Sequence, residues 1–298
     1  MTPLVTLPME SYQLAKYAEP VICFVCDFEN NFDAESCRKC GAPMALTHQA
    51  IGHKTPPQMI TVVGPPGAGK TVYLGMLLDL LARRTSGIRA LARGAFSVSL
   101  QQQAVESLSR CEFPGETSSD PDDWNWVHCQ VHLSRRRATR EVVLADPAGE
   151  AMLAHIDGMV HQPAVQALFS RSIAALVLVD ITQVEAGGSD AEYFAVKALS
   201  NLAEHHKRGR STWSRRPVAV VFTKADDCEA CCDDPAGYAD RHCSGLAQFC
   251  RERFTKVEFF AASVARSTKL ANGLDVPLRI EPRGIVEPFE WLVRGMKR

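Results

Sequence analysis

The sequence predicts an α/β protein with three layers around a mixed, mostly parallel sheet, preceded by a small cysteine-rich unit. An apolar strand at 59–63 runs through a glycine-rich loop into a helix-like stretch at 72–84. Apolar runs at 172–181 and 215–223 have the length and composition of strands buried on both faces. Two C-x-x-C pairs before residue 41 predict the additional unit.

Composition and charge exclude several classes of protein. A chain of 298 residues suffices for one large α/β domain and a small appendage. The formal net charge of −1 creates no bulk field for nucleic acid or acidic lipid. No apolar run reaches the length of a membrane span, and residues 1–20 lack the pattern of a secretory signal. Because four of the eleven cysteines are paired at metal-binding spacing, we expect a reducing, cytoplasmic compartment.

The paired cysteines predict a metal site. The four candidate ligands are Cys23, Cys26, Cys37 and Cys40. Four thiolates fill a closed tetrahedral zinc site and leave no open position for catalysis. Because so short a segment has little core, zinc would supply most of its folding free energy. The spacing, with Asn30 between the pairs, resembles the zinc finger of Ran-binding proteins and related bacterial zinc ribbons, although Val21 stands where that finger carries Trp.

Residues 64–71, GPPGAGKT, match G-x-x-x-x-G-K-[ST] between a strand and a helix. Glycines let backbone N–H groups wrap around phosphate oxygens, and the following helix adds the positive end of its dipole. We expect Lys70 to reach the β- and γ-phosphates and the Thr71 hydroxyl to ligate Mg²⁺. The predicted phosphate-binding residues are Gly64, Pro65, Pro66, Gly67, Ala68, Gly69, Lys70 and Thr71.

A second group of candidate residues follows two strand-like segments, 125–133 and 140–146, which we expect to form an antiparallel hairpin. The second segment ends in Asp146-Pro147-Ala148-Gly149. A carboxylate at the tip of a buried strand can hold Mg²⁺ directly or through water. Gly149 lets a backbone N–H approach the γ-phosphate. This matches the D-x-x-G motif of GTP-binding proteins.

A third group follows the strand at 215–223 and reads Thr223-Lys224-Ala225-Asp226. It resembles the N/T-K-x-D motif of GTPases. The resemblance implies that Asp226 accepts hydrogen bonds from guanine N1–H and the 2-amino group, a donor pair that adenine lacks. It also implies that the Lys224 stem packs over the base. After a last strand at 257–264, the backbone N–H of Ala262 is expected to meet the guanine carbonyl.

These motifs occur in the order of the Ras-like, translation-factor-related class of P-loop GTPases, which the chain resembles from residue 58 to about 265. Each stands at the carboxyl end of a strand, where an open α/β sheet binds ligands. The chain most resembles the bacterial double-GTPase group, which is associated with conflict and signalling gene clusters. The resemblance is carried by the zinc ribbon and by the segments GKTVYLGML, FPGET, DPAGE and TKAD. The resemblance implies GTP and GDP as ligands, with Mg²⁺ and Zn²⁺ as cofactors.

The resemblance also suggests catalytic roles. A threonine of the first switch loop, here Thr117, would ligate Mg²⁺ together with Thr71 and Asp146. Glu150 stands where Ras-like enzymes carry a water-positioning Gln, and it adds negative charge beside a phosphate. Pro66 stands where Ras has Gly and narrows the path for an arginine finger. With Lys70, Thr117 and Glu150 as catalytic residues, we predict slow hydrolysis.

The predicted organisation is a tail at 1–20, a zinc finger at 21–44, a linker at 45–57 and a P-loop GTPase domain at 58–298. The predicted function is a GTP-binding molecular switch whose finger docks a protein effector or regulator, with a second GTPase as one candidate. Three alternatives stay open: an inert GTP-binding scaffold, an ATPase with Asp146 and Glu150 as an acidic pair, and an RNA-binding module. The neutral charge disfavours nucleic acid.

A further cysteine-rich stretch, 228–250, leaves a second metal site open, with Cys228, Cys231 and Cys243 as candidate ligands. The alternative interpretation is that these cysteines belong to the apolar core, because Cys is among the residues most often buried. The C-terminal segment predicts an edge strand or loop and then a helix from about Ile285, with Trp291 and Leu292 packed against the sheet.

Overall fold

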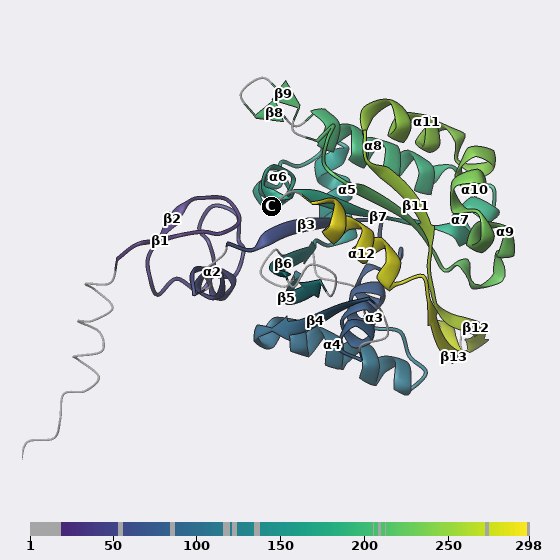
Figure 1. Ribbon diagram of the computed structural model, residues 1–298, viewed down its shortest axis with the longest axis horizontal. Coiled ribbons are helices and arrows are strands. Elements are labelled where there is room, and N and C mark those ends of the chain that lie inside the picture. The colour runs from purple at the N-terminus through teal and green to yellow at the C-terminus, as the bar shows by residue number, and fades with distance from the viewer. Residues whose placement is uncertain are drawn as a thin grey trace, which may run out of the picture.

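A seven-stranded sheet between two helical layers forms the body of the protein (Figure 1). The computed structural model describes residues 19–52, 56–83, 87–115, 120, 124–133, 138–204, 206–207, 210–211, 213–271 and 274–296. The sheet consists of β3 (Gln58–Val63), β4 (Ile88–Arg93), β5 (Asn125–Leu133), β6 (Ala138–Asp146), β7 (Ala174–Asp180), β10 (Val218–Thr223) and β11 (Val257–Ala261). The strand order is β11-β10-β7-β3-β6-β5-β4.

Strand β5 is antiparallel to both its neighbours, β4 and β6, whereas the other neighbouring strands of this sheet pair in parallel. The mixed, mostly parallel three-layer fold is therefore confirmed, as is the hairpin of β5 and β6. In this hairpin Asn125 pairs with Asp146 and Gln130 pairs with Glu141. The carboxyl ends of β3, β6, β7 and β10 meet at one edge of the sheet, where an open α/β fold binds its ligand.

Two apolar cores lie on opposite faces of the sheet. One joins the sheet to α3 (Lys70–Ala82), α4 (Gly94–Ser109) and α12 (Val286–Gly295). The other joins it to α5 (Gly149–Ile156), α6 (Pro163–Arg171), α8 (Asp190–Glu204), α10 (Pro235–His242) and α11 (Ser244–Arg253). Strands β7 and β10 are buried along their whole length because helices cover both faces, which explains their unbroken apolar runs.

Strand β4 has no counterpart in the sequence prediction. Its sequence, IRALAR, contains good helix formers, yet Ile88 and Ala90 are buried and alternate with exposed Arg89 and Leu91. Pairing with β5 at the sheet edge therefore overrides local propensity here.

The cysteine-rich unit comprises β1 (Val21–Ile22), β2 (Glu29–Asn30) and α2 (Met44–Ile51). Helix α2 occupies much of the segment predicted as a linker, so that part of the segment is helical. The helix forms because Met44, Leu46 and Ala50 pack inwards, and because the prolines flank it instead of interrupting it. The domain boundaries themselves stay a prediction.

The cysteine-rich unit packs on the domain that follows it. Its buried residues share one continuous apolar core with β3, β5 and the helices of one face. The Arg171 guanidinium lies 5.1 Å from the centre of the Phe24 ring, and its Nη1 lies 3.4 Å from Asp27 Oδ1. The Gln49 carboxamide lies so close to Gly94 that a Cβ there would meet it at 2.2 Å.

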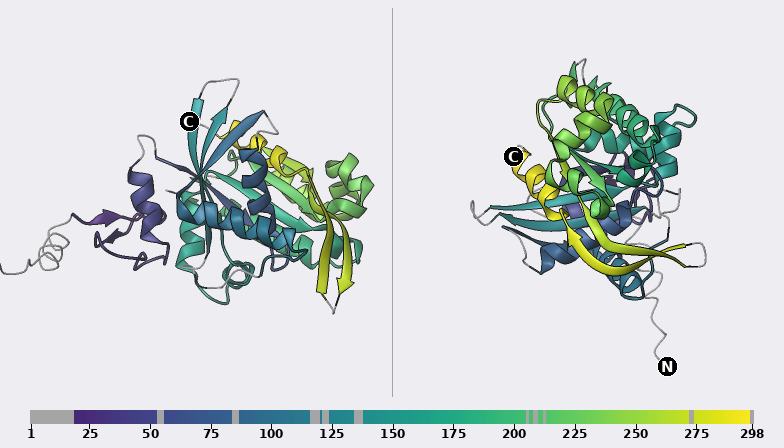
Figure 2. Two further views of the ribbon diagram at one scale, coloured as in Figure 1. Left: turned by 90° about the horizontal axis from the view of Figure 1, so that it is seen from below. Right: turned by 90° about the vertical axis from the view of Figure 1, so that its right-hand side faces the viewer.

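The predicted last strand, 257–264, is divided between β11 and β12 (Ser263–Ala271). Strand β12 pairs with β13 (Leu274–Arg283) in a two-stranded ribbon that projects from the body (Figure 2). The predicted C-terminal helix is present as α12, where Leu292 is buried and Trp291 meets Phe260 edge-on at 6.1 Å. Short elements are α7 (Ile181–Glu185), η2 (Ala225–Asp227), α9 (Glu229–Asp233), β8 (His206–Lys207) and β9 (Arg210–Ser211). None of the helices found in the described residues has the length and apolarity to cross a membrane.

Candidate nucleotide-binding site

The glycine-rich loop joins β3 to α3. Gly67 and Gly69 have φ values of +76° and +79°, a backbone region that L side chains rarely adopt. The Lys70 Nζ donates to the carbonyl oxygens of Gly64 at 3.1 Å and Pro65 at 3.3 Å. The ammonium group is therefore already folded back over the loop, within the cradle predicted for phosphate. Helix α3 begins at Lys70 without a side-chain cap, so its first N–H groups point into the same loop.

Gly149 brings the D-x-x-G segment against this loop. A Cβ at position 149 would lie 2.4 Å from the backbone nitrogen of Pro66, closer than real Cβ atoms approach. Glycine is therefore required by packing at this point. Gly149 also begins helix α5, so the first N–H groups of this helix lie next to the phosphate loop.

Asp146, the last residue of β6, is fully buried. Its Oδ2 accepts hydrogen bonds from Thr71 Oγ1 and from Asn125 Nδ2, both at 3.1 Å. Its Oδ1 is buried without a hydrogen-bond partner. Burial raises the pKa of the carboxyl above 3.8, while Lys70, Asn125 and Thr71 oppose the rise. An unsatisfied carboxylate oxygen beside a threonine hydroxyl suits a hard, oxygen-seeking cation, so the residues present fit Mg²⁺.

The predicted base-binding residues follow β10. The Thr223 hydroxyl donates to the carbonyl oxygens of Ala68 at 3.0 Å and Val179 at 3.3 Å, which ties this strand end to the phosphate loop. Lys224 is left-handed, with φ of 59°, and its Nζ lies 2.6 Å from Asp180 Oδ2. Asp226 is half-buried in the short helix η2.

Ala262 lies beside this turn. Its N–H donates to the Phe222 carbonyl at 2.8 Å, and its own carbonyl accepts from the Ala225 N–H at 3.2 Å. Ala262 therefore anchors the TKAD turn to the end of β11. Because its N–H already donates to Phe222, the predicted contact with the guanine carbonyl would require this hydrogen bond to be shared or broken, and that contact stays a prediction.

Sequence reasoning missed Asn125 and Asp180. Asp180 is the last residue of β7. Its Oδ1 accepts hydrogen bonds from the backbone N–H and from the hydroxyl of Thr182. A polar residue ending an apolar run was the available signal. No sequence signal pointed to Asn125, because its contact with Asp146 depends on the register between β5 and β6. Glu150 is exposed in the first turn of α5, and Thr117 lies outside the described residues.

The four paired cysteines form a compact cluster. All their sulfurs lie within 4.8 Å of one another, with Cys23–Cys40 at 3.8 Å and Cys26–Cys37 at 3.5 Å. A zinc tetrahedron with Zn–S bonds of about 2.3 Å has sulfur–sulfur edges of about 3.8 Å, so the cluster fits zinc. Hydrogen bonding, first from the Cys40 thiol, lowers the pKa of Cys23, whereas the same contact raises the pKa of Cys40 and burial raises the pKa of Cys26.

Asn30, the last residue of β2, contacts this cluster. Its Nδ2 donates to Cys37 Sγ at 3.5 Å, and its Oδ1 accepts from the Arg38 N–H at 3.0 Å. The residue between the two pairs thus holds one knuckle in place, as an outer partner of a metal ligand does.

The cysteines after β10 behave differently. Among the described residues, the N-terminal cluster is the one group of three or more candidate ligands whose ligating atoms lie close together. Cys231, Cys243 and Cys250 are buried in the apolar core. Burial raises the pKa of Cys243 and of Cys250 to about 12, so these thiols stay protonated. The described structure therefore favours a core role over a second metal site.

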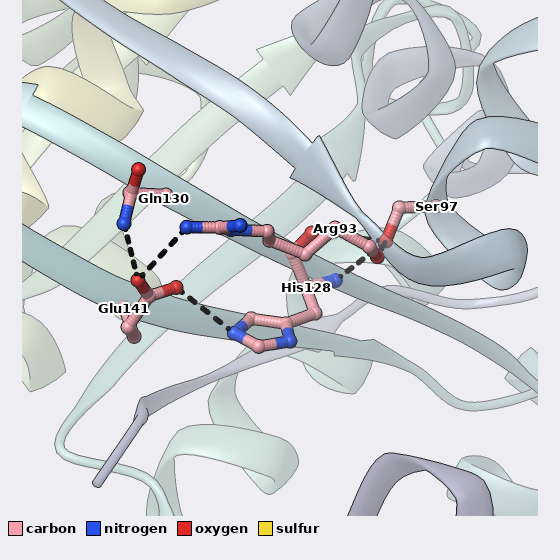
Figure 3. Close-up of polar contacts among 5 residues, drawn as sticks. All are labelled: Arg93, Ser97, His128, Gln130 and Glu141. Atoms are coloured by element: carbon pink, nitrogen blue, oxygen red, sulfur yellow. Dashed lines mark hydrogen bonds and ion pairs between the residues drawn. The ribbon is translucent and has the colours of Figure 1, made fainter. Parts of the chain in front are cut away.

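A buried polar cluster lies further along β5 and β6 (Figure 3). Glu141 contacts His128 Nε2 at 3.1 Å, Gln130 Nε2 at 2.7 Å and Arg93 Nη2 at 3.7 Å. A pocket of about 220 Å³ lies beside it, lined by His48, Gln49, Gly52, Arg93, Gly94 and His128. Glu141 precedes Asp146 by five positions on β6, so this cluster is separate from the nucleotide-binding end.

The fold and the site define a P-loop GTPase. Its three motifs lie at the carboxyl ends of three strands: GPPGAGKT at that of β3, DPAG at that of β6 and TKAD at that of β10. The chain belongs to the Double-GTPase 2 family, whose model matches residues 58–276. Among solved structures, it is similar to a crystal structure of a mutant S. thermophilus NFeoB bound to GDP. The sequence identity is 13% and the TM-score is 0.35, and the match covers 80% of this chain and 62% of that chain. No curated protein matches the sequence.

Proposed function

We propose that the protein is a GTP-binding switch that hydrolyses GTP slowly with the help of Mg²⁺. The observation that carries the proposal is the contact of Thr71 with Asp146 beside the glycine-rich loop, where one carboxylate oxygen is buried without a partner. A divalent cation held by Thr71 and Asp146 would satisfy that oxygen and would offset the negative charge of bound phosphates.

The residues divide into a phosphate end and a base end. At the phosphate end, the Lys70 ammonium would exchange its loop carbonyls for phosphate oxygens, which are stronger acceptors because they are charged. At the base end, Asp226 would accept from guanine, and Lys224 would cover the ring. The ion pair between Lys224 and Asp180 supports this role of Lys224, because it holds the lysine side chain at the end of β7.

Slow turnover follows from two features. Glu150 places a carboxylate where a neutral side chain would orient water, and its exposure leaves its position undefined by packing. Pro66 lies against Gly149, which adds bulk beside the γ-phosphate position. Thr117 is proposed as the switch threonine that ligates Mg²⁺.

We further propose that the zinc finger docks a protein effector or regulator, with a second GTPase as a candidate, in bacterial signalling or conflict systems. Its packing on the domain supports a role in presenting a rigid surface. Exposed Ile22, Phe28 and Phe32 supply apolar contact area on this surface.

Competition binding and phosphate release test the nucleotide proposal. We expect GTP to displace a fluorescent GDP analogue far better than ATP, and Mg²⁺-dependent phosphate release to continue over several turnovers. Glu150→Gln should leave GTP affinity nearly intact and change the single-turnover rate. Equal displacement by ATP would favour the ATPase, and GTP binding without turnover would favour the inert scaffold.

Metal analysis tests the finger. We expect one zinc per chain, and loss of that zinc in Cys37→Ser, with Cys243→Ser as the matched control that keeps it. Structural zinc contributes about 10–16 kcal/mol in isolated fingers, so Cys37→Ser should expose residues 21–44 to proteolysis. Salt-sensitive RNA binding that disappears in the same variant would favour the RNA-binding alternative.

A further inference from the structure

We propose that Asn125 is a positioning residue for the Mg²⁺ site, and this inference rests on the proposed function. Its side-chain amide holds one oxygen of Asp146, so that the other oxygen faces the metal. The hydrogen bond from Asn125 Nδ2 to Asp146 Oδ2 is 3.1 Å long. Thr71 Oγ1 donates to the same oxygen at the same distance, so two elements, β5 and α3, fix one edge of the carboxylate.

Strand pairing explains why Asn125 reaches this place. It is the first residue of β5 and the direct cross-strand partner of Asp146, the last residue of β6. Directly opposed residues of an antiparallel pair have Cβ atoms about 4.5–5.5 Å apart and project on one face. Its neighbours Trp124 and Trp126 are both buried, which holds the start of β5 in place.

The two oxygens of Asp146 therefore have different surroundings. Oδ2 accepts two hydrogen bonds, whereas Oδ1 is buried and accepts none. A buried carboxylate oxygen with no partner is costly, so a cation at Oδ1 relieves that cost. Thr71 gives its proton to Oδ2. Asn125 donates to the same oxygen, so toward Asp146 it orients the metal ligand.

The same two strands supply a matched control. Gln130 and Glu141 are also direct cross-strand partners, and Gln130 Nε2 donates to Glu141 Oε1 at 2.7 Å. This second amide–carboxylate pair belongs to the polar cluster of Figure 3, and its Glu141 precedes Asp146 by five positions on β6. An effect of losing any cross-strand amide should appear at both positions, whereas an effect on Mg²⁺ should appear at Asn125 alone.

The test uses the full zinc-loaded chain and the dissociation rate of a fluorescent N-methylanthraniloyl GDP, measured while MgCl₂ is titrated and again in buffer without Mg²⁺; no chelator is added, because a chelator would also remove the structural zinc. We expect Asn125→Ala to raise the Mg²⁺ concentration for half-maximal retention about 10-fold or more, the usual effect of removing an outer partner of a metal ligand. Its dissociation rate without Mg²⁺ should equal that of the wild type. Asn125→Gln keeps a side-chain amide donor, so its Mg²⁺ concentration for half-maximal retention should lie between those of the wild type and Asn125→Ala. Gln130→Ala should match the wild type throughout.

Two outcomes overturn the inference. One is an unchanged Mg²⁺ midpoint in Asn125→Ala. The other is faster dissociation to the same extent with and without Mg²⁺, which shows a structural role only. If the wild type itself retains the analogue no better with Mg²⁺ than without, the proposed function fails instead, so the two failures are distinguishable.

Discussion

The phosphate end and the base end of the site are built in different ways. At the phosphate end, side chains from α3, β5 and β6 contact one another directly, through Thr71, Asn125 and Asp146. At the base end, the predicted residues are tied mainly to the scaffold: Thr223 to the phosphate loop, and Lys224 to Asp180. The difference teaches that contacts among the protein's own side chains join the elements of the phosphate end. The base end instead offers Asp226 from a turn that backbone contacts hold in place.

The largest expected effect is at the phosphate end. Lys70→Ala should weaken GTP and ATP binding alike by roughly 100-fold, because two charge-assisted hydrogen bonds of about 1.5 kcal/mol each disappear. Isothermal titration with both nucleotides measures this. A loss confined to GTP would contradict the division of the site into two ends.

A similar but selective effect is expected at the base end. Asp226→Ala should lower GTP affinity by about 1.5–3 kcal/mol, because the guanine donors lose a charged acceptor. ATP affinity, however weak, should not change. The ratio of the two affinities is the measurement, with Asp227→Ala as the neighbouring control. A GTP preference that survives in Asp226→Ala would remove Asp226 from the base site.

A smaller effect is expected from the support of Lys224. Asp180→Asn keeps the acceptor for Thr182 but loses the ion pair, in which Lys224 is 45% exposed and therefore screened by solvent. We expect GTP binding to weaken about 3- to 5-fold and stability to fall by less than about 1 kcal/mol. Urea unfolding measures the change in stability, and GTP titration measures the change in affinity. A change in ATP affinity of the same size would assign Asp180 to the phosphate end.

The smallest effect concerns pH. Burial raises the pKa of the Asp146 carboxyl above 3.8, so the folded state binds this proton more tightly than the unfolded state does. The stability of the nucleotide-free protein should therefore fall as pH rises through the range just above 3.8, and Asp146→Asn should abolish this part of the dependence. Urea unfolding of both proteins at several pH values measures the difference. Parallel curves would show that Asp146 is not the source.

Short motifs predicted most of the phosphate end, because residues 64–71 carry their loop geometry within eight consecutive positions. The zinc cluster was predictable for the same reason, since each C-x-x-C pair folds locally. Asn125 was not predictable, because its role depends on strand register, which is a tertiary property. Asp180 had a sequence signal, since it is a polar residue that ends an apolar run, but its pairing with Lys224 depends on strand order. Strand β4 and helix α2 escaped prediction because packing partners far along the chain decide their structure.

The shared core of the cysteine-rich unit and the GTPase domain has a practical consequence for deletion work. A recombinant protein starting at residue 58 would remove the cover from apolar side chains of the core that includes Met59 and Trp126. Newly exposed apolar area of this kind favours aggregation. Such a truncated protein would behave poorly in solution for reasons unrelated to nucleotide chemistry. Point substitutions in the full-length chain are therefore the better way to separate the two parts.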